Sequence, residues 1–328
     1  MKAIEFREVS KQFAGALRPA VDSVSLGVDS GEFVVLLGPS GCGKTTLLKM
    51  VNRLYEPTRG TILVEGRDIR EGSVTELRRG IGYVIQQTGL FPHMTVAQNV
   101  AVVPRLLKWP AARIDERVDT LLALVGLPPD EYRARYPAQL SGGQQQRVGL
   151  ARALAADPHI MLMDEPFGAI DAITRTRLQG ELLDLQRQLH KTVLFVTHDV
   201  EEALRLADRI VVMRAGQVVQ YDTPFNILTQ PADDFVRDLV DANDILRQLS
   251  QVRVATAMTP ADDAFPAHDA PALCPDDDLR DALSLFLRTG ADSLPVVDDG
   301  RVVGRVDLAN IRTRAEDRQK ATTPARTP

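Results

Sequence analysis

The feature that most constrains the fold of this chain is a glycine-dense break at residues 34–50. The stretch reads VVLLGPSGCGKTTLLKM, so that an apolar run meets three glycines, a lysine and two threonines before apolar residues resume. An ordinary loop needs only one Gly or Pro, and three glycines therefore indicate that something approaches the backbone very closely. We expect a buried strand, a tight loop and a helix in succession.

The loop itself matches the pattern GxxxxGK[ST] between Gly38 and Thr45, in the strand–loop–helix context that this pattern requires. Glycines let backbone N–H groups turn toward the phosphates of a nucleotide, Lys44 adds a positive charge, and the Thr45 hydroxyl can bind Mg²⁺. A glycine turn with an incidental lysine is the alternative, and the flanking strand and helix disfavour it. The predicted phosphate-loop residues are Gly38, Pro39, Ser40, Gly41, Cys42, Gly43, Lys44, Thr45 and Thr46.

A second apolar run, IMLMDEP at residues 160–166, ends in two acids. At the end of a strand, Asp164 is placed to hold Mg²⁺ and Glu165 to act as general base on an attacking water. Such a pair alone is more often a solvated turn. Together with a phosphate loop, the catalytic interpretation is favoured.

A third motif, LSGGQQQR at residues 140–147, places Ser141 and two glycines directly before a helical pattern. Serine and glycine at a helix N-terminus present a hydroxyl and N–H groups to an anion, although a plain helix cap has the same composition.

These motifs resemble the nucleotide-binding subunit of ATP-binding cassette (ABC) transporters over residues 1 to about 240. GPSGCGKT, VIQQTGLFPHMTV, LSGGQ, IMLMDEP, GAID and VTHD occur in the order found in that family. The resemblance implies an ATPase that uses ATP and Mg²⁺, with Gln86 both catalytic and metal-binding, Asp171 in the D-loop and His198 at the γ-phosphate. Phe13, 25 residues before Gly38, matches the aromatic that stacks on adenine.

The family also implies a homodimer in which each ATP lies between two chains. The phosphate loop, Gln86, Asp164, Glu165 and His198 would act from one chain, and Ser141, Gly142, Gly143 and Gln144 from the other. ATP would hold the dimer closed and hydrolysis would release it, since the attraction depends on the intact triphosphate.

The pattern of apolar runs predicts an α/β fold. Strand-like runs at 33–37, 160–163, 193–197 and 210–213 alternate with helical patterns, which indicates a mostly parallel sheet. The resemblance makes this a P-loop NTPase cassette at residues 1–240, with a helical subdomain at about 88–158.

After the cassette, residues 233–250 read as a helical segment, of which we take 241–251 as a linker. A small α+β module is expected at 252–315 and a disordered tail at 316–328. In the module, five apolar residues from Leu279 to Leu287 form the stripe of an amphipathic helix, and Asp299-Gly300 predicts a hairpin turn.

Composition limits the possible partners. A formal net charge of −5 gives no overall basic field, so a nucleic-acid role is not expected. Two cysteines are too few for a disulfide framework, and neither a signal peptide nor a membrane-spanning run is found. With the resemblance, we expect a peripheral protein on the cytoplasmic side of the inner membrane, bound to a permease and served indirectly by an extracytoplasmic substrate-binding protein.

Subfamily resemblance suggests the cargo. Segments such as LLKMVNRLYEPTRGTILVEGRDI look closest to importers of quaternary-amine osmoprotectants: glycine betaine, proline betaine, choline or carnitine. That subfamily carries cystathionine-β-synthase (CBS) type modules, which residues 252–312 resemble. Only one copy is clear, and Asp307 and Asn310 replace the Thr or Ser and the Asp of nucleotide-binding versions, so ligand sensing and a structural role both stay open. The alternatives are an importer of another amine or an amino acid, or a soluble non-transport ABC ATPase.

Overall fold

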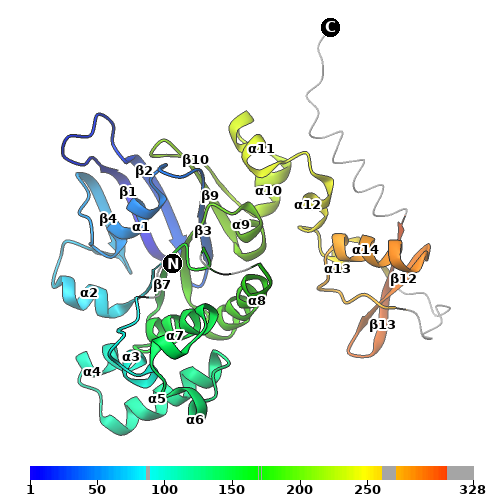
Figure 1. Cartoon of the computed structure of the whole chain (residues 1–328). Helices are drawn as coiled ribbons and strands as arrows, with labels where there is room; N and C mark the ends of the chain where they lie inside the picture. The colour runs from blue at the N-terminus through cyan, green and yellow to red at the C-terminus, as the bar shows by residue number, and fades with distance from the viewer. Residues whose placement is uncertain (86–88, 169, 171, 261–270, 309–328) are drawn as a thin grey trace. The chain divides into compact units, whose positions relative to one another are not determined.

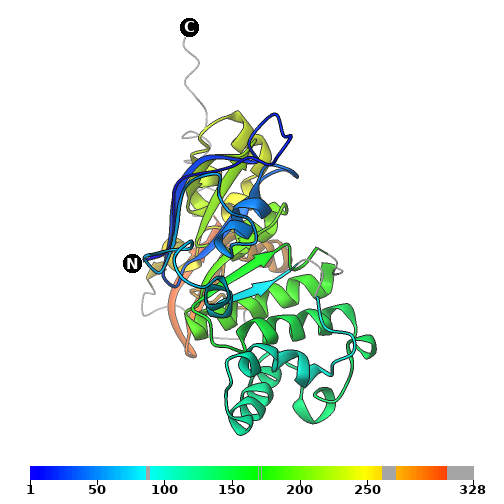
Figure 2. The same cartoon turned by 90° about the vertical axis from the view of Figure 1, so that its left-hand side faces the viewer.

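The computed structural model describes residues 1–85, 89–168, 170, 172–260 and 271–308 (Figures 1 and 2). The chain comprises two compact units, the first from Met1 to Tyr221 and the second from Asp222 onward. The predicted Gln86, Asp171, Asn310 and tail at 316–328 lie outside the described residues.

A largely parallel six-stranded sheet forms the centre of the first unit, in the order β10-β9-β3-β8-β7-β6. Strand β3 pairs in parallel with β8 and β9, and β7 pairs in parallel with β6 and β8. All residues of β3, β7 and β8 are buried, as expected for strands covered on both faces. The four predicted strands are confirmed, each within one residue of the predicted ends. The bounds are β3 (Phe33–Leu37), β6 (Ile81–Val84), β7 (Ile160–Asp164), β8 (Thr192–Val196), β9 (Arg209–Arg214) and β10 (Gln217–Asp222).

A second, antiparallel sheet, which the sequence analysis did not predict, has the order β2-β1-β4-β5. Helix α1 (Lys44–Val51) shares one apolar cluster with this sheet and with the parallel sheet, through residues such as Phe6, Leu48 and Leu194. The helix that follows the phosphate loop is therefore fixed by packing on both sides. The strands are β1 (Lys2–Lys11), β2 (Val21–Asp29), β4 (Arg59–Val64) and β5 (Arg67–Asp68).

The chain between β6 and β7 is helical, and its helices gather at one end of the parallel sheet in both views (Figures 1 and 2). They fall inside the predicted helical subdomain, whose limits stay a prediction. The bounds are α3 (Val96–Val100), α4 (Val102–Leu106), α5 (Ala111–Leu124), α6 (Pro129–Tyr132), a 3₁₀ turn (Pro137–Gln139) and α7 (Gly142–Leu154). The remaining helices of this unit are α2 (Val74–Gly80), α8 (Ala172–Leu189) and α9 (Val200–Leu206).

The second unit combines short helices with a three-stranded sheet of order β11-β13-β12. The helical segment expected at 233–250 is broken, because Asp241 adopts a left-handed conformation with φ 48° and ends α11. Leu249, inside the expected linker, belongs to the apolar core of this unit. The bounds are α10 (Pro224–Thr229), α11 (Asp234–Val240), α12 (Ile245–Leu249), α13 (Val254–Ala257), β11 (Thr259–Pro260), α14 (Leu279–Thr289), β12 (Ser293–Asp298) and β13 (Arg301–Asp307).

The predicted hairpin is confirmed, since β12 and β13 pair in antiparallel fashion around Asp299 and Gly300, with φ values of 45° and 76°. Two positive φ angles are typical of the tight turn that an Asp-Gly pair favours. The predicted apolar stripe is only partly right. Phe286 is buried, whereas Leu287 is 77% exposed, because the helical repeat places it at the edge of the stripe.

Among the described helices, none combines the length and the hydrophobicity that a membrane span requires.

The contrast between Phe286 and Leu287 gives a test of the second unit's core. Phe286→Ala should lower its free energy of unfolding by about 3–5 kcal/mol, the usual cost of an emptied aromatic site. The neighbouring control Leu287→Ala should change it by less than about 0.5 kcal/mol. Hydrogen exchange of the β12 and β13 amides in the full-length protein measures both, and equal protection in the two variants would contradict the assigned burial.

Candidate functional site

The phosphate loop lies where strand β3 ends and helix α1 begins, and two of its glycines are required by the surrounding chain. A Cβ on Gly38 would lie 2.3 Å from the Met213 carbonyl oxygen, and a Cβ on Gly43 would lie 2.3 Å from that of Ala20. Both glycines also have positive φ angles of 151° and 108°. The close approach inferred from the sequence is thus made, in part, by the protein's own backbone.

Lys44 brings a buried positive charge to this loop. Lys44 is only 5% exposed, and its Nζ donates to the carbonyl oxygens of Gly38 at 2.6 Å and Pro39 at 3.0 Å. A cation at a helix N-terminus that opens from a glycine loop suits a phosphate group. Cys42 is buried beside it, with Sγ 3.9 Å from Nζ.

Two oxygen ligands of the kind that Mg²⁺ prefers meet at the start of α1. The Thr45 hydroxyl donates to Asp164 Oδ1 at 2.8 Å, which brings together the helix after β3 and the last residue of β7. Hydroxyl and carboxylate oxygens fit a hard cation of this class. Lys49 was missed by the sequence analysis, and its Nζ lies 3.7 Å from the other oxygen of Asp164.

The structure brings the proposed base and the histidine together. Glu165 Oε1 lies 3.3 Å from His198 Nδ1, and the Glu165 backbone N–H donates to the Val196 carbonyl at 3.0 Å. Glu165 has a φ of 45°, a strained value that is uncommon outside glycine and recurs at functional sites. Because β7 and β8 are parallel neighbours, residues that follow both strands meet at one edge of the sheet.

A buried carboxyl group supports the backbone around His198. Glu202 is 5% exposed and accepts a hydrogen bond of 2.6 Å from the Thr197 hydroxyl. Burial raises the pKa of Glu202 above its usual range. On the other side of the histidine, Asp199 caps α9 through the N–H groups of Glu201 and Glu202. The residues on both sides of His198 are therefore held by side-chain hydrogen bonds.

The predicted residues at 141–144 of the LSGGQ motif cap α7 and form its first turn. We call these residues the signature turn, and α7 the signature helix. The Ser141 hydroxyl accepts from the Gln144 N–H at 3.3 Å, and Gln144 Oε1 accepts from the Ser141 N–H at 2.9 Å. This reciprocal pair is a capping box, so the helix-cap interpretation of the motif is part of its role. Gly142 and Gly143 follow without a side chain, and a Cβ on Gly143 would already lie 3.0 Å from Thr174.

In front of this turn lies a cavity of about 580 Å³. Residues that the sequence analysis missed contribute to it, among them Tyr132, Thr174 and Arg177. The Tyr132 hydroxyl accepts a hydrogen bond of 3.1 Å from the Gln144 side chain. None of the phosphate-loop residues lines this cavity, so one chain presents the two halves of the predicted site separately.

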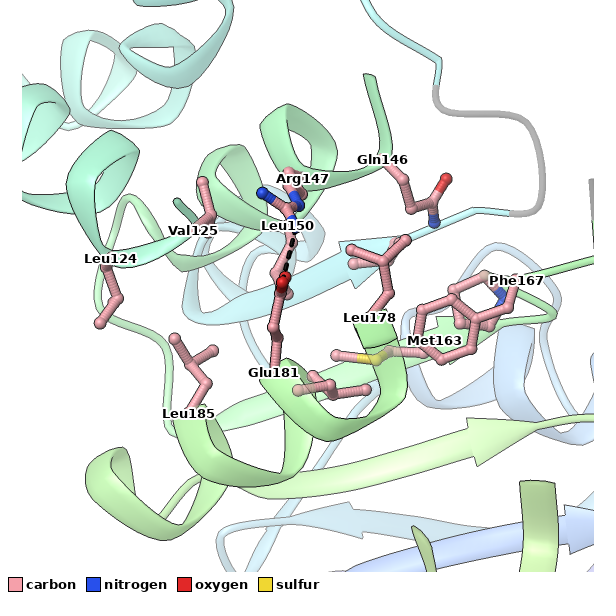
Figure 3. A pocket seen from close by; sticks show the side chains of 13 residues that line it. Leu124, Val125, Gln146, Arg147, Leu150, Met163, Phe167, Leu178, Glu181 and Leu185 are labelled. Atoms are coloured by element: carbon pink, nitrogen blue, oxygen red, sulfur yellow. Dashed lines mark hydrogen bonds and ion pairs between the residues drawn. The ribbon is translucent and has the colours of Figure 1, made fainter. Parts of the chain in front are cut away.

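Figure 3 shows the junction between the signature helix and helix α8. Arg147 on α7 and Glu181 on α8 form an ion pair of 2.6 Å across a small apolar cavity of about 40 Å³. Leu178 and Phe167 line the cavity, the latter two residues after Glu165. This ion pair and the apolar contacts tie the signature helix to the region of the proposed base.

Phe13 lies in the loop between β1 and β2 and is 38% exposed. Its ring meets that of Tyr55 edge to face with centroids 5.2 Å apart, and Lys11 Nζ lies 5.2 Å from its centroid. A partly exposed aromatic ring is suited to stack on the adenine of a nucleotide. The stacking role of Phe13 stays a prediction.

In the second unit, Asp307 is the last residue of β13, and its Oδ2 lies 3.7 Å from Arg305 Nε.

Comparison with known families agrees with these motifs. A model described as ABC transporter matches residues 21–168, and a model described as CBS domain matches residues 261–317. The glycine betaine/carnitine/choline transport ATP-binding protein OpuCA of Bacillus subtilis is 48% identical over 322 residues, which cover 97% of this chain and 81% of OpuCA. The sulfate/thiosulfate import ATP-binding protein CysA of Thermosynechococcus vestitus is 50% identical over 244 residues, 74% of this chain and 71% of CysA.

Among solved structures, the dimeric ATP-binding cassette MJ0796, bound to ADP and Pi in a post-hydrolysis state, matches with a TM-score of 0.61 and 33% identity. The match covers 67% of this chain and 98% of MJ0796. The predicted fold class is therefore confirmed. With a full set of cassette motifs and close relatives that span both of its units, the chain belongs to the ABC transporter family, as an ATP-binding subunit that carries a C-terminal CBS domain.

Proposed function

We propose that this protein hydrolyses ATP to energise the import of a quaternary-amine osmoprotectant, such as glycine betaine, proline betaine, choline or carnitine, through a membrane permease. The supporting observation is the extent of similarity. The relative named for glycine betaine, carnitine and choline aligns with 97% of this chain, whereas the sulfate/thiosulfate relative has a similar identity but aligns with 74% of it. Percentage identity over the aligned residues thus does not separate the cargoes, and the similarity that extends over 97% of this chain favours the quaternary amines.

The proposed chemistry assigns a role to each part of the site. The phosphate loop with Lys44 binds the β- and γ-phosphates, and Thr45 and Asp164, with Gln86, would hold Mg²⁺. When bound, the metal neutralises charge on the phosphate oxygens. Glu165 takes a proton from the attacking water, and His198 orients the Glu165 carboxylate and the γ-phosphate. The distance of 3.3 Å between His198 Nδ1 and Glu165 Oε1 supports the contact with the carboxylate.

We further propose that the working form is a homodimer. In one chain the signature turn faces its own cavity and not the phosphate loop, so Ser141 and the glycines at 142 and 143 need a nucleotide from a second copy. The dimeric state of the similar cassette MJ0796 supports this arrangement. Phe13 and Asp171 would complete the site on the nucleotide-binding side.

The partners and location follow from the transport role. We expect the dimer to bind the cytoplasmic side of transmembrane permease subunits in the inner membrane, as a peripheral protein. An extracytoplasmic substrate-binding protein would deliver the cargo to the permease, without contact with this chain.

The cargo is tested by reconstituting this chain with its permease and binding protein in liposomes. ATP-dependent uptake of labelled glycine betaine, choline or carnitine is the expected result, with no uptake of sulfate. Uptake of an amino acid alone would favour the alternative prediction, an importer of another amine or an amino acid. Co-purification with ribosomes or DNA in place of a membrane permease would favour a soluble ABC ATPase.

The general base is tested by Glu165→Gln, which keeps the shape of the side chain and removes its basicity. ATP should still bind, turnover should fall by about 100-fold or more, and the protein should accumulate as a nucleotide-bound dimer. Steady-state ATPase assays and size-exclusion chromatography with ATP measure the two effects. Unchanged turnover would refute the assignment.

The phosphate-binding charge is tested by Lys44→Ala, with Lys2→Ala as a control on an exposed lysine of β1. Loss of Lys44 removes the buried cation and should weaken ATP binding itself by about tenfold or more, since hydrogen bonds to charged groups contribute about 1.5–3 kcal/mol. Titration with a fluorescent ATP analogue measures the affinity. Equal affinity in both variants would contradict the proposed loop function.

A further inference from the structure

Arg175, in the first turn of α8, contacts three residues in two other segments of the first unit: the loop before α8 and the start of α9. Its Nη2 donates to the Ile170 carbonyl oxygen at 3.1 Å, and its Nη1 donates to Asp199 Oδ2 at 3.4 Å. Its Nε lies 4.0 Å from Glu202 Oε1. A guanidinium has donors fixed in a planar fork and is therefore suited to hold several oxygens in one geometry. The sequence analysis did not single out this residue.

The residues that Arg175 contacts lie close in the sequence to Glu165 and His198, the proposed catalytic pair. Ile170 directly precedes Asp171 in the chain, and Asp199 directly follows His198. Arg175 also lines a small cavity of about 40 Å³ together with Glu165 and His198. One side chain thus connects the loop after the general base with the loop that carries the histidine.

We propose that Arg175 is a positioning residue for ATP hydrolysis, which holds His198 in register with Glu165 by tying the Asp199 carboxylate to the Ile170 carbonyl. The proposal rests on the proposed roles of Glu165 and His198. In this scheme Arg175 does not contact the reacting atoms, and acts through the residues that follow Glu165 and His198 in the chain.

Charge gives a second reason for an arginine at this position. The carboxyl groups that line the cavity are those of Glu165, Asp199 and Glu202, and Arg175 provides the permanent positive charge among the described lining residues. Like charges so close repel one another, and in a partly buried space water screens this repulsion weakly. Removing the Arg175 guanidinium should let the loop that carries His198 move away from the loop that follows Glu165.

The contact with Asp199 is separable from the helix cap. Asp199 accepts the N–H groups of Glu201 and Glu202 through Oδ1, whereas Arg175 contacts Oδ2. Asp199→Asn therefore keeps an oxygen for the cap, because asparagine is as good a cap as aspartate, and removes the charge that faces Arg175. This variant tests the same link without truncating the half-buried Arg175 side chain.

The experiment compares Arg175→Ala, Arg175→Lys and Asp199→Asn with Arg187→Ala, an exposed arginine near the end of the same helix. Steady-state assays give kcat and KM, and a fluorescent nucleotide gives the ATP affinity. We expect kcat to fall about tenfold in Arg175→Ala and in Asp199→Asn, with KM and affinity within about twofold of the parent. Arg175→Lys should recover part of the loss, since it keeps the charge without the fork.

A double-mutant cycle distinguishes positioning from a general effect on folding. If Arg175 acts through His198, Arg175→Ala should lower kcat by less than about twofold when His198 is already alanine. Independent, multiplying losses in the two backgrounds would overturn the proposal, as would a kcat of Arg175→Ala equal to that of Arg187→Ala. Should Arg175→Ala fail to fold, the same cycle is run with Asp199→Asn, and the same two outcomes decide it.

The outcome is also distinguishable from failure of the proposed function. Full turnover in Glu165→Gln and His198→Ala would refute the catalytic roles of these two residues, and with them the positioning role of Arg175. Loss of turnover in those two variants with unchanged kcat in Arg175→Ala and Asp199→Asn would leave the catalytic pair in place and overturn only the role of Arg175.

Discussion

The parallel pairing of β3, β8 and β7 is the constraint on which the site depends. Parallel strands end at the same edge of a sheet, so the phosphate loop, His198 and the acids at 164 and 165 meet although they lie far apart in the sequence. The strands are wholly buried, and their register is held by apolar contacts on both faces. A slip of one strand would separate Thr45 from Asp164, which now lie within a hydrogen bond of each other.

Tight backbone packing prepares this edge. Gly38 and Gly43 lie against carbonyl oxygens of neighbouring segments, and Glu165 adopts a left-handed conformation beside the Val196 carbonyl. The left-handed conformation of Glu165 costs free energy that the surrounding structure must offset, whereas glycine adopts positive φ angles without steric penalty. This packing fixes the backbone at the ends of β3 and β7, next to which Lys44 and Glu165 stand.

The signature turn illustrates how one motif serves two purposes. Ser141 and Gln144 cap α7 reciprocally, which stabilises the helix in a single chain, and the same turn lines a large cavity that lacks the phosphate loop. Arg147 then connects the helix to Glu181 on α8. A second copy of the chain would find the turn already formed, so dimer closure would require little local ordering.

Much of the site was predictable because its motifs are local. GxxxxGK[ST], the strand-terminal acids and the SGG turn each depend on residues close in sequence, and four of the six strands of the parallel sheet were readable as apolar runs. The strands β6 and β10, the antiparallel sheet and the break of the helix at Asp241 were not predicted, since they depend on contacts between segments that apolar runs do not reveal.

The sequence by itself thus determined the family, four strands of the parallel sheet and the identity of the candidate catalytic groups, because local patterns of glycine, charge and apolar residues specify them. Only the tertiary structure decided which distant side chains support those groups. Lys49, Tyr132 and Arg175 stand in ordinary helical segments, and their partners lie on other elements. Side chains from different segments meet only when the sheet and its helices are packed, and so no local pattern could have identified them.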